Sequence, residues 1–531
     1  MASSINVREK LGQLAQKRVL ILDGAMGALI QAFRTPSGQA LTEDDFRGLT
    51  SGAQGERFRD HPLPLKGCND LLCVTMPELI SGIHEAYLKA GADIIETCSF
   101  NANAISLADY GLGDLVYEIN VAAARLARKE ADRFSTPDKP RFVAGSMGPT
   151  PKSAGFCQDM NNPEKRAISW DELEAAYYDN ARGLLDGGVD IIIIETVFDT
   201  LNAKAAIFAV RRLAQERGVD VPIIVSATVS EGGRLLSGQT VEAFCVSVLH
   251  ANPLALGLNC SFGAEKLKSH IAAVSAFVPC LVIAYPNAGL PNHLGAYDES
   301  PESMANHIEG YMAEGLVNIA GGCCGTTPAH IAAISERAKN YSPRPLPVFP
   351  QKIYLAGLEI LKISPEQGLV LSGNTETAGN SKLSRLIKEG KYEDAVDTVL
   401  DTVDNGAVIV EVRIDDVEKA AMVCFLNTAL FYPDIARLPI MIESSRWDLV
   451  EAGLKCLPGK GLVYSISLKD GEAEFLRRSH LARAYGAAVV VALIDEQGPA
   501  VSDERKLSIA ERSRKLLIGS GYPPEDFIFE K

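Results

Sequence analysis

Three cysteines have the type and placement to hold a metal ion: Cys260 in Gly-Leu-Asn-Cys-Ser, and the adjacent pair Cys323 and Cys324 in Gly-Gly-Cys-Cys-Gly-Thr-Thr-Pro. Each group ends a short apolar run that predicts a β-strand. If these strands belong to one parallel barrel, the thiols meet at the end where such folds keep their active sites. Three thiolates with an open fourth position are typical of a sulfur-rich zinc site that accepts one more ligand, and another thiol is the natural one.

Spacing alone leaves two other interpretations of these cysteines open. A buried cysteine is most often a small apolar residue of the core, and this suits most of the 11 cysteines in the chain. The adjacent pair could also form a vicinal disulfide, which a reducing compartment disfavours. The metal interpretation is favoured because neighbours on a strand face opposite sides, which makes two adjacent cysteines a poor packing arrangement. The spacing is not the double Cys-x-x-Cys pattern that indicates zinc directly.

The elements that must position these cysteines alternate regularly through the first 340 residues. Apolar, β-branched runs are separated by longer amphipathic stretches, such as 77–90, whose apolar residues recur with helical spacing before Gly91. Continuous apolar strands between helices indicate a parallel sheet covered by helices, and eight of them predict a closed (β/α)₈ TIM barrel. The predicted strands are 18–23, 93–98, 141–146, 190–196, 222–228, 254–260, 280–285 and 317–320.

A proline-rich stretch then divides the chain into two domains. We predict a first barrel over 1–340, a linker over 341–353 and a second α/β domain over 354–531. The second part contains six strand-like runs, at 368–371, 408–412, 440–443, 462–465, 489–493 and 527–530. A barrel of this kind needs eight strands to close. The second domain is therefore expected to be truncated, completed by another polypeptide, or an open sheet.

Composition excludes several classes of function. The chain has 531 residues, 47% of them hydrophobic and 22% charged, and a net charge of −15, which argues against a nucleic-acid partner. We find no apolar run of about 18 residues and no signal-peptide pattern, so neither a membrane span nor secretion is expected. The dilute cysteines predict a reducing, cytoplasmic location with free thiols.

Seven motifs, in order, cover nearly all of residues 10–340. The chain thereby resembles the homocysteine S-methyltransferase family and, within it, the homocysteine-binding module of cobalamin-dependent methionine synthases. The resemblance implies a methyltransferase that forms methionine from L-homocysteine in a zinc-bearing barrel, with Cys260, Cys323 and Cys324 as both the zinc ligands and the catalytic cysteines. The motifs are Leu22-Asp23-Gly24-Ala25-Met26-Gly27, Glu96-Thr97-Cys98-Ser99-Phe100-Asn101, Gly148-Pro149-Thr150, Glu195-Thr196, Gly257-Leu258-Asn259-Cys260, Tyr285-Pro286-Asn287-Ala288-Gly289 and Gly321-Gly322-Cys323-Cys324-Gly325.

An amino-acid substrate also needs its charged ends recognised. Glu195, at the end of a predicted strand, is a candidate partner for the α-ammonium group, although a helix cap or an ion pair is the alternative. Asn259 and Asn287 end strands beside the proposed metal and are expected to orient ligands or loops.

The turn Asp23-Gly24-Ala25-Met26 follows the first predicted strand. Its small residues could let backbone N–H groups face the α-carboxylate, as anion-binding turns do. Asp23 could instead be a simple helix N-cap.

Residues 351–531 resemble the pterin-binding barrel of the same synthases, but the polar positions that face a pterin are changed. Replaced ligands leave buried polar groups unpaired, each costing roughly 1–3 kcal/mol, so methyltetrahydrofolate binding is doubtful. The alternative is that the chain is a fragment whose missing strands restore a site. The altered stretches are Ser372-Gly373-Asn374-Thr375-Glu376, Glu411-Val412-Arg413, Glu443, Tyr464 and Glu530-Lys531.

The methyl donor is not identified by the sequence. We find no Asp-x-His-x-x-Gly signature of a cobalamin-binding module, so methylcobalamin is expected only through a partner corrinoid protein or a missing module. Two alternatives remain. The barrel could use S-methylmethionine or betaine as donor, or the protein could be a non-catalytic scaffold stabilised by zinc.

Overall fold

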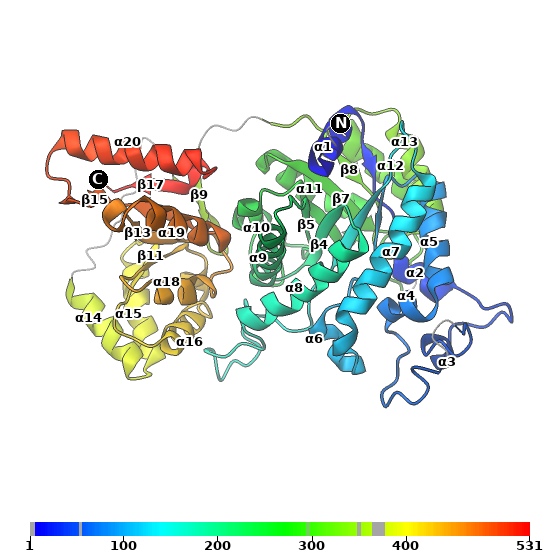
Figure 1. Ribbon diagram of the computed structural model, residues 1–531, viewed down its shortest axis with the longest axis horizontal. Helices are drawn as coiled ribbons and strands as arrows, with labels where there is room; N and C mark the ends of the chain where they lie inside the picture. The colour runs from blue at the N-terminus through cyan, green and yellow to red at the C-terminus, as the bar shows by residue number, and fades with distance from the viewer. Residues whose placement is uncertain are drawn as a thin grey trace.

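The chain folds into two domains that lie side by side, one coloured blue to green and the other yellow to red (Figure 1). The computed structural model describes residues 6–52, 56–293, 295, 297–347, 352–363 and 377–530, and the side chains of all of these except 377–381.

The first domain is an eight-stranded parallel barrel, which confirms the predicted fold. Neighbouring strands pair in the order β1-β8-β7-β6-β5-β4-β3-β2. The ring closes between its two ends because Leu22 bridges Ile94 and because the Asp93 amide donates to the Ile21 carbonyl over 2.7 Å. The strands are β1 (Leu20–Ile21), β2 (Ile94–Glu96), β3 (Phe142–Met147), β4 (Ile191–Val197), β5 (Ile223–Ala227), β6 (Ala255–Gly263), β7 (Leu281–Asn287) and β8 (Ile319–Ala320).

Helices surround the barrel. The predicted helix over 77–90 is α5, which begins at Pro77 and ends where Gly91 adopts a left-handed φ of 110°. A further helix, α1 (Val7–Lys17), closes the amino-terminal end of the barrel with Leu11 and Ala15 packed on the strand interior. No helix among the described residues is both long and apolar enough to cross a bilayer. The covering helices are α5 (Pro77–Ala90), α7 (Val116–Phe134), α8 (Trp170–Gly187), α9 (Thr200–Arg217), α10 (Val241–Val248), α11 (Ala264–Phe277), α12 (Pro301–Ala313) and α13 (Pro328–Ala338).

The two-residue period of the strands turns polar side chains into the barrel at its carboxyl-terminal end. On β4, Ile191 and Ile193 belong to the interior cluster that packs on α1, and the next residue with the same orientation is Glu195. On β2, Ile94 precedes Glu96 in the same way. The interior is therefore apolar near α1 and polar at the opposite end.

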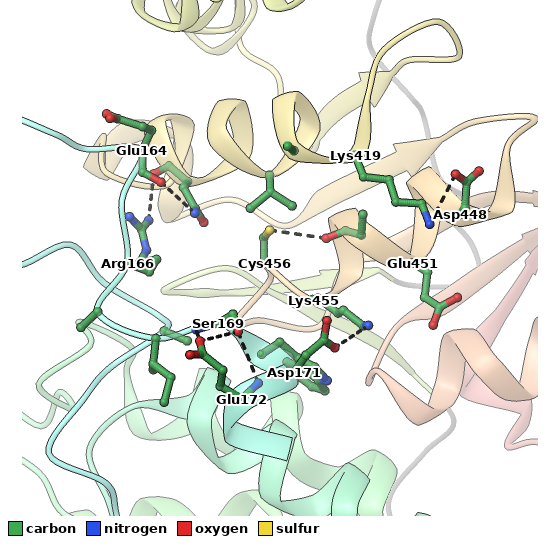
Figure 2. Close-up of a pocket in the computed structure, with 18 residues that line it drawn as sticks. Glu164, Arg166, Ser169, Asp171, Glu172, Lys419, Asp448, Glu451, Lys455 and Cys456 are labelled. Carbon is green, nitrogen blue, oxygen red and sulfur yellow. Dashed lines mark hydrogen bonds and ion pairs between the residues drawn. The ribbon is translucent and has the colours of Figure 1, made fainter. Parts of the chain in front are cut away.

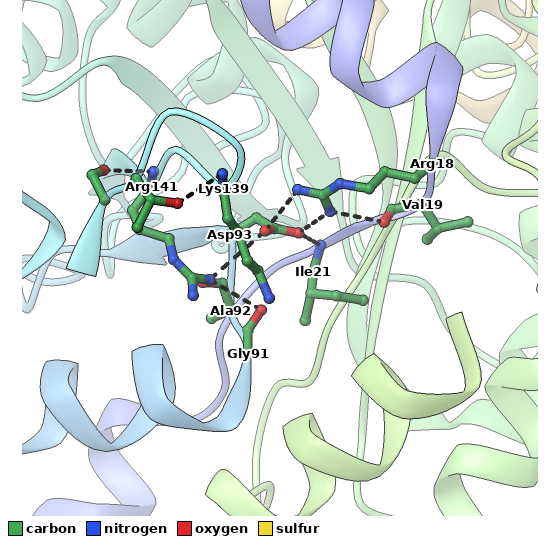
Figure 3. Close-up of polar contacts among 10 residues, drawn as sticks. Arg18, Val19, Ile21, Gly91, Ala92, Asp93, Lys139 and Arg141 are labelled. Atoms are coloured by element: carbon green, nitrogen blue, oxygen red, sulfur yellow. Dashed lines mark hydrogen bonds and ion pairs between the residues drawn. The ribbon is translucent and has the colours of Figure 1, made fainter. Parts of the chain in front are cut away.

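A buried ionic network holds the amino-terminal end of the barrel together (Figure 3). Asp93, 1% exposed, accepts from the Ile21 amide over 3.0 Å and from both terminal nitrogens of Arg18 over 2.6 and 3.0 Å. Arg141 approaches the other side of the carboxylate at 3.7 Å and donates to the Gly91 and Ala92 carbonyls. Asp93 thereby ties the start of β2 to β1 across the closing seam.

The second domain is an incomplete parallel barrel. Five strands pair in the order β11-β12-β13-β14-β17. A hairpin of β9 (Ile353–Ala356) and β10 (Ile360–Ile363) packs Leu355 and Ile363 against Met441 and Leu462 of the sheet. The predicted run 368–371 lies outside the described residues. The strands are β11 (Val410–Arg413), β12 (Ile440–Glu443), β13 (Leu462–Ile466), β14 (Ala488–Val491) and β17 (Phe527–Phe529).

The described part of the predicted linker is anchored rather than free. Arg344, 3% exposed, donates to the Val278 carbonyl over 2.7 Å and to the Ser275 hydroxyl over 2.8 Å. The predicted end of the linker at 353 coincides with the start of β9, so the hairpin belongs to the second domain.

Polar contacts join the two domains directly. The Lys204 ammonium of α9, 1% exposed, donates to the carbonyls of Leu457 and Gly459 in the second domain over 2.7 and 3.0 Å. A cavity of about 610 Å³ lies at the junction, and beside it Lys455 pairs with Asp171 over 2.8 Å. Figure 2 shows the residues that line this cavity. This cavity is lined by residues of both domains and by none of the predicted site residues.

Candidate functional site

The structure brings Cys260, Cys323 and Cys324 together at the carboxyl-terminal end of the first barrel. The Sγ atom of Cys260 lies 3.1 Å from that of Cys323 and 3.5 Å from that of Cys324, and the last two are 4.0 Å apart. Among the described residues, these three form the one group of three or more side chains with the spacing of metal ligands. The side chains come from the end of β6 and from the turn that follows β8.

The backbone bends sharply where β6 delivers its cysteine. Cys260 and Ser261 adopt left-handed φ angles of 55° and 63°, and the pairing of β6 with β7 shifts register between Cys260 and Gly263. Such conformations are costly for residues with a Cβ and persist only where the surroundings impose them. Here the Ser261 hydroxyl accepts from the Val229 amide over 2.8 Å, which holds the bend. The bend frees Cys260 from strict strand alternation, so that it joins the other two thiols.

The chemistry of the three sulfurs fits a zinc ion. Tetrahedral zinc with sulfur bonds of ~2.3 Å places its sulfurs about 3.8 Å apart, close to the observed spacing. Without a cation, three such near neighbours cannot all be charged. Hydrogen bonds from Cys260 and Cys323 lower the pKa of Cys324 to about 3, whereas the contact with Cys260 raises the pKa of Cys323 well above its ordinary value. A divalent cation would allow all three to be thiolates.

Asn259 and Asn287, two of the site residues predicted from the sequence, contact this cluster from behind. The Asn259 amide donates to the Thr196 hydroxyl over 2.8 Å and approaches the Cys323 sulfur at 3.8 Å, while its oxygen accepts from Ser226 over 2.8 Å. The Asn287 oxygen accepts from the Cys324 amide over 3.1 Å. Both asparagines are buried, so each orients a cysteine rather than facing solvent.

Three carboxylates end strands β1, β2 and β4 in the same barrel mouth. Glu195 is hydrogen bonded by the Ser146 hydroxyl and, over 3.5 Å, by the Tyr285 hydroxyl, and burial raises its pKa to about 7. Burial, followed by the neighbouring carboxylates, also raises the pKa of Glu96 well above its usual range. Asp23 Oδ1 and Glu96 Oε1 are buried without a hydrogen-bond partner in the described structure. Acidic oxygens left unpaired in this way indicate a site for a cationic group.

Glu96 is the residue of this group that our sequence reasoning did not single out. The signal was present, because Glu96 follows the buried pair Ile94 and Ile95 at the end of a predicted strand. A carboxylate with the same orientation as a buried Ile two residues earlier must enter the barrel.

The turn from Asp23 to Met26 is more constrained than the sequence predicted. The N-cap of α2 (Met26–Ala32) is Ala25, so Asp23 is not a helix cap. Asp23 Oδ2 instead accepts from the Glu96 amide over 3.0 Å. The Ala25 amide donates to the Thr326 hydroxyl over 3.1 Å. Of the four residues, Gly24 and Met26 therefore carry the amides that remain candidates for a carboxylate.

Polar side chains at the mouth of the second domain pair with one another, in one ion pair and one hydrogen bond. Arg413 contacts Glu443 at 3.2 Å, and the Tyr464 hydroxyl donates to Glu530. Burial, with the Glu411 charge, raises the pKa of Glu443 to about 7 despite Arg413. The altered stretch 372–376 lies outside the described residues.

Two separate parts of the chain match known protein families. Residues 20–338 match the family "Homocysteine S-methyltransferase", and residues 373–529 match "Pterin binding enzyme". Among solved structures, the metallated form of the homocysteine methyltransferase MmuM from Escherichia coli is 24% identical, with 61% of this chain and 98% of that chain covered and a TM-score of 0.45. The oxidized form of the same protein is 23% identical over the same coverage, with a TM-score of 0.46. Because the first family match spans more than half of the 531 residues, the chain belongs to the homocysteine S-methyltransferase family and carries a pterin-binding domain behind its methyltransferase barrel.

Proposed function

We propose that the protein transfers a methyl group to the thiol of L-homocysteine, with Cys260, Cys323 and Cys324 holding a zinc ion that activates this thiol. The observation that carries the proposal is the meeting of three cysteine sulfurs, none more than 4.0 Å from another, in a barrel mouth that also holds unpaired acidic oxygens. The sulfurs suit a soft metal, and the acids suit an amino group. Homocysteine carries a thiol and an amino group in one small molecule.

Different groups of the site bind the substrate and activate its thiol. Zinc, when bound, supplies the Lewis acidity that keeps a substrate thiol deprotonated at neutral pH, where a free thiol has a pKa near ~8.5. Glu195 and Glu96 accept the α-ammonium group, with the Ser146 hydroxyl fixing one Glu195 oxygen. The Asp23 carboxyl lies beside them with a pKa that burial raises well above its ordinary value, and the amides of Gly24 and Met26 are left for the α-carboxylate. The substrate is thereby oriented before the methyl group arrives.

X-ray absorption at the zinc edge tests the proposal. The metal should show three sulfur neighbours and one lighter neighbour in the free protein, and four sulfur neighbours after L-homocysteine is added. A spectrum that homocysteine leaves unchanged would instead support the non-catalytic scaffold, in which zinc only stabilises the fold. In that case chelation would unfold the barrel, which circular dichroism can follow.

The donor is proposed to be a methylcobalamin carried by a partner corrinoid protein or by a further module. A pre-methylated donor such as S-methylmethionine or betaine is the alternative. Methionine formation should be measured with each donor in turn, with the same zinc-loaded protein. Turnover with methylcobalamin but with neither small donor would support methylcobalamin. Turnover with S-methylmethionine or betaine would identify that compound as the donor instead.

The second domain is proposed not to bind methyltetrahydrofolate usefully. Arg413, Glu443, Tyr464 and Glu530 pair with one another at the ends of the strands, where a pterin would need free donors and acceptors. Lys204 of the barrel is buried in the domain junction, which suits a structural role for this half. Micromolar binding in a titration with methyltetrahydrofolate would contradict this part of the proposal.

The boundaries 1–340, 341–353 and 354–531 also remain predictions, as does a cytoplasmic location. Limited proteolysis would test the boundaries. Because Arg344 is buried, cleavage should occur after it rather than at it.

A further inference from the structure

The Asn259 side chain connects the sulfur side of the barrel mouth to its acidic side. Asn259 precedes Cys260 in the chain, and its amide approaches the Cys323 sulfur at 3.8 Å. The same side chain also binds Thr196, the residue that follows Glu195. The Asn259 oxygen accepts from the Thr196 amide over 3.0 Å, and the Asn259 amide donates to the Thr196 hydroxyl over 2.8 Å. One asparagine therefore ties the backbone beside Glu195 to the backbone beside Cys260.

Thr196 is held in a backbone conformation that a β-branched residue disfavours. Its φ is 54°, and the pairing of β4 with β5 shifts register around it. Four non-glycine residues with a positive φ occur in the part of the chain that the structure describes, and three of them, Thr196, Cys260 and Ser261, lie at this contact. Such strain persists only where the surroundings impose it, and here both hydrogen bonds from Asn259 impose it. Because Glu195 is the preceding residue, the direction of its side chain depends on this held conformation.

We propose that Thr196 is a positioning residue that sets the separation between the Glu195 carboxylate and the cysteine sulfurs. The Ser146 hydroxyl fixes one carboxylate oxygen, and Thr196 fixes the backbone from which the side chain extends. A substrate is held best when its ammonium group and its thiol reach both ends of the mouth at once. The separation of these ends selects L-homocysteine over L-cysteine, which is one methylene shorter. This inference rests on the proposed function and adds a residue that determines its specificity.

The test compares Thr196→Val with the wild type, both loaded with zinc, by calorimetric titration. Valine keeps the β-branched shape and removes only the hydroxyl that accepts from Asn259. The dissociation constant of homocysteine should rise about tenfold, the usual scale for the loss of one hydrogen bond in a protein. 4-Mercaptobutyrate, which is homocysteine without its amino group, should bind both proteins equally because it has no group for Glu195. L-Cysteine should also bind both equally, so the preference for homocysteine should fall about tenfold.

Three further variants complete the comparison. Thr196→Ser keeps the hydroxyl and should restore the wild-type affinity for homocysteine. Thr196→Gly relieves the backbone strain and removes the hydroxyl, so it replaces the valine variant if that protein does not fold, and it should show the same selective loss. Thr428→Val is the matched control. It removes a buried hydroxyl that donates to the Cys424 carbonyl over 2.8 Å in the second domain, and it should change none of the affinities.

Two kinds of failure can be told apart. Equal weakening of homocysteine and 4-mercaptobutyrate in Thr196→Val would overturn the role proposed for Thr196, because a residue that acts through Glu195 cannot affect a ligand without an amino group. Unchanged binding of homocysteine, or loss of zinc from the variant, would overturn it as well. A wild-type protein that does not bind homocysteine in the presence of zinc would instead overturn the proposed function, and the role of Thr196 with it.

Discussion

Buried carboxylates have different surroundings at the two ends of the first barrel. At the amino-terminal end, Asp93 is surrounded by Arg18, Arg141 and the Ile21 amide, so its charge is balanced within the protein (Figure 3). At the carboxyl-terminal end, Asp23 and Glu96 each keep a buried oxygen without a hydrogen-bond partner among the residues that the structure describes. Burial raises the pKa of both groups well above the ordinary range, so their ionisation needs a cationic group that arrives from outside. The comparison distinguishes a carboxylate that stabilises the fold from carboxylates that are suited to binding a ligand.

The largest effect should follow from breaking the sulfur cluster at the mouth. Cys323→Ala removes one of three thiolates and should abolish zinc retention and lower turnover at least about a thousandfold. Metal analysis of the purified variant and an assay of methionine formation check this. Cys456→Ala, in the second domain, is the control and should keep both. Activity in a metal-free Cys323→Ala protein would count decisively against the proposed function.

The next largest effect should come from the amino-terminal end of the barrel. Asp93→Asn leaves Arg18 and Arg141 without their anion and should lower the free energy of unfolding by about 3–5 kcal/mol. Because Asp93 lies at the opposite end from the cysteines, the KM for homocysteine should not change in the folded variant. Urea denaturation and steady-state kinetics measure the two quantities. A raised KM with normal stability would show that Asp93 acts in substrate binding and not in holding the fold together.

For a carboxylate at the mouth, we expect a substitution to weaken homocysteine binding, which the substitution of Asp93 should leave unchanged. Glu195→Gln keeps the size of the side chain but loses the charge that attracts the α-ammonium group. Loss of a charge-assisted hydrogen bond of ~1.5–3 kcal/mol should weaken homocysteine binding about 10- to 100-fold. Calorimetric titration of the zinc-loaded variant measures this. The idea fails if the variant binds homocysteine as tightly as wild type does.

The last prediction concerns the pH dependence of stability at Glu195. Its pKa in the folded protein is raised to about 7 from an ordinary value of 4.5, so the folded state holds the proton more tightly than the unfolded state does. Below pH 4.5 both states are protonated and the residue costs nothing. Between pH 4.5 and 7 the unfolding free energy of the wild type should fall relative to that of Glu195→Gln, by about 3 kcal/mol.

Denaturation of both proteins from pH 4.5 to 8 measures this difference. Above pH 7 the advantage of the glutamine variant should stay constant. A difference that does not vary with pH would mean that Glu195 ionises as readily in the folded protein as in the unfolded chain.

Much of the barrel could be predicted because its signals are local. All eight strands were expected from apolar runs between amphipathic stretches, and each appears in the sheet. The convergence of Cys260 with Cys323 and Cys324 was expected because parallel strands of one barrel end at the same face. The prediction of Glu195 as a site residue followed from its place after a buried run, together with the family resemblance.

Other features could not be predicted because they depend on segments far apart in the chain. The partners of Asp93 lie 75 residues before it, at Arg18, and 48 residues after it, at Arg141. The hairpin of β9 and β10 went unrecognised because its first strand follows directly on a proline-rich stretch.

The sequence itself determined the order of the apolar runs and which cysteines and acids end them. This is because strand period and side-chain chemistry are properties of neighbouring residues. Only the tertiary structure decided which acids are neutralised and which stay unpaired. That depends on which side chains, distant in the chain, enclose each carboxylate once the ring of strands has closed, and no local pattern records it.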